Sequence, residues 1–252
     1  MSHVYGIATA TLLILIGYLA GSGINYLADV LPVYRRPVQP FCLECHEPQP
    51  VWAFLFSLFR YSSCGHSRPI RVLFVLLIGI ACAFWMWLLP PARLNPILGY
   101  LLLVYFGLVI VIDVEHKLIL HPVSLAGVVI CGGIGWLRHG LLSTLVGGAA
   151  GFGIMLGLYL LGELFIRGLR KRRGETVDEI ALGFGDVNLA GVIGLLLGWP
   201  GIVPGLILAI LLGGFGSLLY LIWMWVRGRY RVMAAIPYGP FIALSAIILF
   251  FR

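Results

Sequence analysis

The sequence predicts an all-α, polytopic integral membrane protein with about eight transmembrane helices, and three observations support this fold class. Of its 252 residues, 61% are hydrophobic and only 11% are charged, whereas roughly 25% of residues are charged in a soluble domain. Apolar stretches long enough to span a bilayer recur along the whole chain. Positive charge collects in the short segments between these stretches, where positive-inside sorting places it. The amount of apolar surface therefore predicts contact with membrane lipid, and the net charge of +7, gathered in these short segments, does not indicate a nucleic-acid partner.

The expected spans divide the chain into a first transmembrane helix (1–31), a long loop (32–71) and a helical core (72–252). The first span lacks a small-residue cleavage site behind a short apolar core, so we expect a retained helix and not a removed signal peptide. The sixth span is short and rich in glycine, and Pro200-Gly201 separates it from the seventh. No internal repeat is expected. In chain order, the eight spans are predicted at about 4–30, 72–90, 96–114, 118–137, 141–167, 186–199, 202–226 and 234–251.

The distribution of basic residues predicts the orientation of these spans. If the N-terminus faces out, 14 of the 17 Lys and Arg residues fall in inside segments, and Arg93, Arg138 and Arg252 remain outside. Inside segments of membrane proteins carry such an excess of Lys and Arg. The loop 32–71 is therefore expected at the cytoplasmic face.

Acidic residues at membrane depth point to function, because each costs about 2.5–3.5 kcal/mol on insertion scales. Two of them lie at the cytoplasmic ends of separate predicted spans: Asp113 closes the third span, and Asp186 opens the sixth. The predicted topology thus places both carboxylates at the same depth and on the same face. The other two acidic residues are Asp29, near the end of the first span, and Glu163, which has Arg167 four residues on as a natural partner.

Two carboxylates that share a site cannot both ionise comfortably, so the pair holds a single proton near neutrality. One aspartate can then deprotonate water while the other protonates a peptide carbonyl. Gly183 and Gly185 flank this position, and glycine lets another backbone approach closely, as an extended substrate would need. The alternative interpretation is that each aspartate caps a helix or pairs with a neighbouring Arg or Lys.

Five ordered motifs resemble those of the type IV prepilin peptidase family of GxGD membrane aspartyl proteases, and they run from the first span to the last. The first resembles that family's first-span signature GSFLNVVIYRLP. The motifs are Gly21-Ser22 with Asn25 and Leu31-Pro32; Cys42-x-x-Cys45; Asp113 within Val111–His116; Gly183-Phe184-Gly185-Asp186; and the closing segment Ile236–Phe241.

The resemblance implies that Asp113 and Asp186 are the catalytic pair of an endopeptidase, with Gly183 and Gly185 in the active-site loop. The implied substrates are type IV pilin or pseudopilin precursors, cleaved at the cytoplasmic face of the inner membrane between a short basic leader and a hydrophobic helix. From the sign of their charge alone, the acidic residues Glu44, Glu47, Glu115, Asp178 and Glu179 are candidates to receive the basic leader.

Many members of this family then methylate the new N-terminus with S-adenosylmethionine. Members that do so usually carry a glutamate where Leu76 stands here, so the sequence predicts the peptidase and leaves methylation open. Asn188 also stands where the family often has a lysine after the GxGD motif.

Three cysteines of the loop suggest a metal site, because Cys42 and Cys45 have ligand spacing and Cys64 follows in the same loop. The resemblance implies a second CxxC pair and a structural zinc, but Tyr61 stands where its first cysteine is expected. His46 or His66 would complete a Cys3His set. The alternative is a loop that has lost its metal.

Two further functions remain open from the sequence. The chain would be an ion-coupled membrane transporter if Asp113 and Asp186 bound a proton or cation. It would be a degenerate, non-catalytic component of pilus or secretion assembly if the departures from the family motifs had abolished activity.

Overall fold

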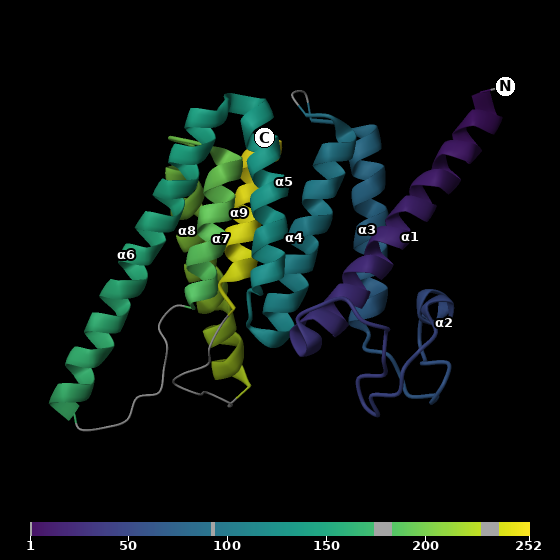
Figure 1. Ribbon diagram of the computed structural model, residues 1–252, viewed down its shortest axis with the longest axis horizontal. Coiled ribbons are helices and arrows are strands. Elements are labelled where there is room, and N and C mark those ends of the chain that lie inside the picture. The colour runs from purple at the N-terminus through teal and green to yellow at the C-terminus, as the bar shows by residue number, and fades with distance from the viewer. Residues whose placement is uncertain (1, 92–93, 174–182, 228–236) are drawn as a thin grey trace. The chain divides into compact units, whose positions relative to one another are not determined.

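A computed structural model describes residues 2–91, 94–173, 183–227 and 237–252. Within these ranges the regular structure is helical, with two isolated β-bridges in the loop after the first helix and no strand. The all-α prediction is confirmed (Figure 1). The described helices are α1 (Ser2–Tyr34), α2 (Val51–Phe56), α3 (Arg71–Leu88), α4 (Pro96–His116), α5 (His121–His139), α6 (Leu141–Arg173), α7 (Phe184–Leu197), α8 (Ile202–Val226) and α9 (Gly239–Phe251).

Each predicted span corresponds to one of these helices, and α2 is an additional short helix inside the loop. Among the described residues, five helices are long and apolar enough to cross a membrane: α1, α3, α4, α6 and α8. The helices α7 and α9 are apolar but shorter. A polytopic membrane protein is therefore confirmed, while the count of eight crossings stays a prediction.

The chain divides into two compact units, Met1–His116 and Lys117–Arg252. In the first unit, α1 packs against α3 and α4. Glycines allow the approach of α1 to α3, since a Cβ at Gly17 would lie 2.4 Å from the Cα of Ile80. Close packing through small residues is the usual way in which helices associate in lipid. This contact fixes α3 and the loop before it against α1.

In the second unit, α7 is the central helix and packs against α5, α6, α8 and α9. Its contact with α6 is again made through glycine: a Cβ at Gly194 would lie 2.2 Å from the carbonyl oxygen of Gly147. Eight of the fourteen residues of α7 are buried, and Asp186 is one of them. The second unit thus encloses the helix that carries the GxGD motif.

Candidate active site and metal centre

Asp113 lies near the C-terminal end of α4, and its side chain is buried. Its exposed fraction is 4%, and Val109 and Ile112 on the same helix are also buried. A buried carboxylate within an apolar span is costly, so a functional role is the default interpretation.

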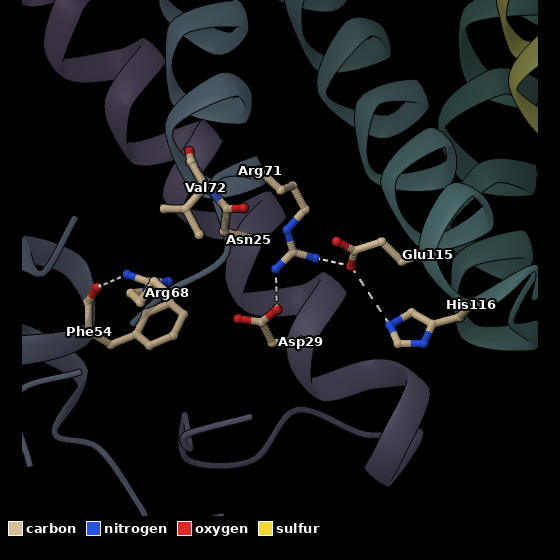
Figure 2. Close-up of polar contacts among 8 residues, drawn as sticks. All are labelled: Asn25, Asp29, Phe54, Arg68, Arg71, Val72, Glu115 and His116. Carbon is tan, nitrogen blue, oxygen red and sulfur yellow. Dashed lines mark hydrogen bonds and ion pairs between the residues drawn. The ribbon is translucent and has the colours of Figure 1, made fainter. Parts of the chain in front are cut away.

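Arg71, the first residue of α3, joins the ends of two other helices close to this position (Figure 2). Its guanidinium donates to Asp29 of α1 with one nitrogen and to Glu115 of α4 with the other. The Asp29 side chain is 2% exposed and the Glu115 side chain 32%. Because the guanidinium is a rigid fork, it holds both carboxylates in fixed positions. The last turn of α4, two residues beyond Asp113, is therefore tied to α1 and α3.

One turn before Asp29 on α1, Asn25 donates from Nδ2 to the carbonyl oxygen of Val72 at 3.3 Å. Two polar side chains of α1, spaced four residues apart, thus contact the start of α3: Asn25 at Val72 and Asp29 at Arg71 (Figure 2). Sequence reasoning singled out both residues but did not predict Arg71 as their common neighbour. The signal in the sequence was the spacing of Asn25 and Asp29, which places both on one face of the first span, together with an arginine at the start of the next span.

The acidic residues that are candidates to bind the leader differ in whether they already have a partner. Glu115 pairs with Arg71, and the Nε2 of His116 lies 3.9 Å from a Glu115 carboxylate oxygen. Asp178 and Glu179 lie outside the described residues. The predicted pairing of Glu163 with Arg167 is confirmed, with 2.6 Å between the oxygen and the nitrogen.

Asp186 lies in the first turn of α7 and caps its own helix. The backbone N–H of Gly183 donates to its Oδ2 at 3.2 Å, and its own N–H donates to the carbonyl oxygen of Gly183 at 3.0 Å. A negative charge is favoured there, because the first turn of a helix presents unpaired N–H groups. Asp186 is 8% exposed. Capping, one of the alternatives considered for this residue, is thus present, and it also fixes the orientation of the carboxylate.

The two glycines of the motif differ in their surroundings. A Cβ at Gly185 would lie 2.8 Å from the Cβ of Ile119, so the absent side chain makes room for the segment before α5. A Cβ at Gly183 would find its nearest atom at 3.4 Å, an ordinary contact, and the φ of Gly183 is −74°. Packing within the chain itself therefore requires glycine at 185 and does not require it at 183.

An open, largely apolar groove of about 790 Å³ runs beside the start of α7 in the second unit. Phe184 and Asn188 line it on either side of Asp186 in sequence, together with His121 and Ser124 of α5. Asn188, which stands where the family often has a lysine, thus lines this groove.

The loop between α1 and α3 brings four potential metal ligands together. The Sγ atoms of Cys42, Cys45 and Cys64 and a ring nitrogen of His66 all lie within 4.8 Å of one another. Thiolates bound to one tetrahedral zinc stand about 3.8 Å apart, given Zn–S bonds of about 2.3 Å. Of the two candidate histidines, His66 completes the set, while the ring of His46 stacks on Phe41 at 5.6 Å.

The two halves of this loop repeat the same backbone geometry nineteen residues apart, so the expectation of no internal repeat is wrong for this loop. Each half is a tight knuckle closed by three backbone hydrogen bonds, one bridge and a residue with positive φ. The bonds run from Cys42 to Glu47, His46 to Cys42 and Gln49 to Pro40, and correspondingly from Tyr61 to His66, Gly65 to Tyr61 and Arg68 to Phe59. Few side chains are shared between the halves, which hid the repeat from sequence inspection.

Tyr61 occupies the position in the second knuckle that Cys42 occupies in the first. It is 2% exposed and packs with Cys42 and Phe54 in a small core. Burial raises the pKa of its phenol to about 12. The aromatic ring thus replaces a metal ligand with apolar packing, and His66, five residues on, supplies the fourth donor.

The electrostatics of the cluster favour a thiolate at Cys42. Burial raises the pKa of this thiol, but hydrogen bonds from the backbone N–H groups of Cys45 and Glu44 and from neighbouring thiols outweigh it and lower the pKa to about 7. The Nδ1 of His66 lies 3.6 Å from Cys42 Sγ, and its Nε2 lies 3.5 Å from a Glu44 oxygen. A carboxylate on the outer nitrogen of a ligating histidine is a common support of zinc sites. The residues present therefore fit a structural zinc.

Comparison with known proteins gives a consistent set of relatives. Residues 100–218, which include Asp113 and Asp186, match the type IV leader peptidase family. The chain is similar to a prepilin leader peptidase/N-methyltransferase of Klebsiella pneumoniae, 26% identical over 225 residues, which cover 81% of this chain and 92% of that relative. It is also similar to a prepilin leader peptidase/N-methyltransferase of Legionella pneumophila, 29% identical over 140 residues, which cover 56% of this chain and 44% of that relative. No solved structure matches the chain.

Proposed function

We propose that this chain is a protease of the type IV leader peptidase family and that it removes the leader from type IV pilin or pseudopilin precursors at the cytoplasmic face of the inner membrane. The observation that carries this proposal is the presence of two buried aspartates, Asp113 and Asp186, inside the segment that matches the family. The orientation with the N-terminus outside rests on the charge distribution.

In the proposed reaction, Asp113 and Asp186 share one proton. The ionised carboxylate takes a proton from water, the resulting hydroxide attacks the carbonyl carbon of the leader's last residue, and the protonated carboxyl donates to the carbonyl oxygen. Collapse of the tetrahedral intermediate breaks the C–N bond, and the departing nitrogen takes a proton from the pair. Either residue can be the base at the start, because the proton belongs to the pair.

The groove beside α7 is the proposed place for the hydrophobic helix of the precursor. Its lining is apolar apart from a few polar groups, and it begins at Phe184, within the GxGD motif itself. A helix lying there would present its cytoplasmic end to Asp186. Gly183 and Gly185 are proposed to give the extended cleavage segment access to the carboxylate from the loop.

The zinc is proposed as a structural staple held by Cys42, Cys45, Cys64 and His66, with no part in the cleavage step. A loop of this size has too little apolar surface for a core of its own, so a metal would supply folding free energy directly.

For methylation, the described residues of the chain do not suggest how a methyl donor would be bound. Leu76, at the position of the family's glutamate, is 4% exposed and packs against Gly21 of α1. It offers no carboxylate to a methyl donor, and we derive no step through S-adenosylmethionine.

Mass spectrometry of a co-expressed pilin-like precursor tests the proposal directly, since one measurement reports both cleavage and an added methyl group. The expected product is shortened by its leader and carries a free, unmethylated N-terminus. A chain that carried both Asp113→Asn and Asp186→Asn is the negative control. A precursor that stayed intact with the wild-type chain would instead support a non-catalytic assembly component, and proton-coupled ion flux in liposomes without cleavage would support a transporter.

A further inference from the structure

The short helix α2 exposes large apolar side chains although it lies in the predicted aqueous loop. Trp52 and Phe56, four residues apart and therefore on one face, are 74% and 72% exposed. Val51 at the start of the helix and Phe59 just beyond it are exposed as well. We call Trp52 and Phe56 the α2 face. An apolar, aromatic face of this kind marks an interaction surface.

The opposite side of α2 is held firmly by the rest of the loop. Phe54 is 2% exposed, and its ring meets Tyr26 of α1 edge-on at 6.2 Å. Arg68, which directly follows the second knuckle, covers the Phe54 ring at 4.0 Å and donates to the carbonyl oxygens of Phe54 and Ser57 at 3.0 and 2.5 Å. The metal cluster, Arg68 and α2 therefore form one body, and the direction of the α2 face is fixed by it.

The position of α2 along the first span decides what the exposed face meets. The hydroxyl of Tyr18 donates to the carbonyl oxygen of Leu55. Tyr18 lies sixteen residues before the end of α1, or about 24 Å along the helix axis at 1.5 Å per residue. Leu55 and Leu58 also line one small void with Ser22 of α1 and Leu76 in the second turn of α3. The loop thus folds back beside the membrane-spanning part of α1 and α3, instead of extending away from it.

We propose that the α2 face lies in the bilayer interface and contacts lipid, so that the loop between α1 and α3 is docked on the membrane. The helices α1 and α3 are long and apolar enough to cross a membrane, so lipid is expected around them. Because α2 lies alongside these two helices, its outward face would continue their lipid-facing surface. Trp and Phe at the boundary, with basic residues beside them, are the usual composition of interfacial helices. Arg35, Arg36 and Arg60 are exposed in the same loop, where they are able to reach anionic headgroups.

This inference does not depend on the proposed peptidase reaction, and its test does not use cleavage as the readout. The photoreactive amino acid benzoylphenylalanine is placed at position 52 or at position 56. The matched control carries it at position 47, an exposed glutamate in the first knuckle. The full-length, zinc-loaded chain is reconstituted in nanodiscs of phosphatidylethanolamine and phosphatidylglycerol, irradiated, and analysed by intact mass.

The expected result is lipid adducts at positions 52 and 56 at several-fold higher yield than at position 47, on the order of fivefold for a face immersed in the interface. Equal yields at all three positions would overturn the proposal. So would crosslinks from positions 52 and 56 to a second copy of the chain or to a co-reconstituted precursor in place of lipid, because the α2 face would then be a protein interface.

A second measurement keeps the test independent of the inserted amino acid. The tryptophan fluorescence of the wild-type chain minus that of Trp52→Phe isolates the signal of Trp52, and Trp52→Phe preserves the apolar character of the face. In nanodiscs that contain brominated lipids, this difference signal is expected to be quenched by about half or more, as for a ring at the headgroup level. An unquenched difference signal in the folded, zinc-loaded protein would contradict lipid contact.

Discussion

The two candidate catalytic aspartates are held in place in opposite ways. Asp186 is positioned by its own helix, through the hydrogen bond between its carboxylate and the N–H of Gly183. The end of the helix that carries Asp113 is positioned from outside, by the Arg71 bridge from Glu115 to Asp29 on α1. The position of Asp186 therefore depends on a few neighbouring residues, whereas the position of the α4 end depends on contacts between distant parts of the chain. Substitutions near the two aspartates should differ accordingly in their effects on stability and on cleavage.

The largest effect is expected from the aspartates themselves. Asp113→Asn and Asp186→Asn should each reduce precursor cleavage below detection, because an amide can neither activate water nor share the proton. Glu163→Gln is the matched control, since it changes a membrane-helix acid that pairs with Arg167 of the same helix. Cleavage is measured by mass spectrometry on equal amounts of inserted protein. Retention of more than a few per cent of activity in either variant would rule out the paired mechanism.

The Arg71 bridge should show its importance mainly in stability. Arg71→Met leaves the buried Asp29 carboxylate without its partner, which typically costs about 3–5 kcal/mol. The double variant Asp29→Asn with Arg71→Met should recover much of that loss, because no unpaired buried charge remains. Glu115→Gln should cost only about 0–1 kcal/mol, since the Glu115 side chain is 32% exposed, against 2% for Asp29.

Thermal unfolding of the solubilised protein ranks these variants. If Glu115→Gln proved as destabilising as Arg71→Met, the buried Asp29 would not be the principal partner of Arg71, contrary to the exposures of the two carboxylates.

The sequence predicted the fold class and the positions of the helices because these depend on apolar periodicity and length, which are local properties. It also predicted the pairing of Glu163 with Arg167, where the spacing along one helix decides the contact. It did not predict the Arg71 bridge. This bridge links Arg71 to Asp29, which is 42 positions away in the sequence, and to Glu115, which is 44 positions away, and it depends on how α1, α3 and α4 pack. The choice of His66 over His46 was open for a similar reason, because it follows from the backbone path of two knuckles whose side chains barely resemble each other.

The glycines of the GxGD motif offer a smaller, sharper test on the Asp186 side of the comparison. Gly185→Ala brings a methyl group to 2.8 Å from Ile119 and should destabilise the second unit by about 1–3 kcal/mol, as overpacking does. Gly183→Ala should leave unfolding nearly unchanged, because its Cβ meets only an ordinary contact at 3.4 Å. Loss of cleavage in Gly183→Ala at full stability would then report the approach of the substrate to the loop, separately from packing.

The smallest effect on cleavage is expected from the metal cluster, which lies in a different part of the chain from both aspartates. Purified protein should carry close to one zinc per chain, and Cys42→Ser or His66→Gln should release it and make residues 36–70 more sensitive to protease. His46→Gln and Tyr61→Phe are the matched controls and should keep the metal, because neither the imidazole of His46 nor the Tyr61 hydroxyl belongs to the cluster.

Zinc should also be lost in acid. The pKa of the Cys42 thiol in the metal-free loop is about 7, so protons compete with the metal for this ligand as the pH falls below that value. Zinc content that was unchanged in His66→Gln but lost in His46→Gln would reassign the fourth ligand. If neither the wild-type protein nor any variant bound zinc stoichiometrically, the Tyr61 substitution would mark the loss of the site, and packing around Phe54 and Arg68 alone would order the loop.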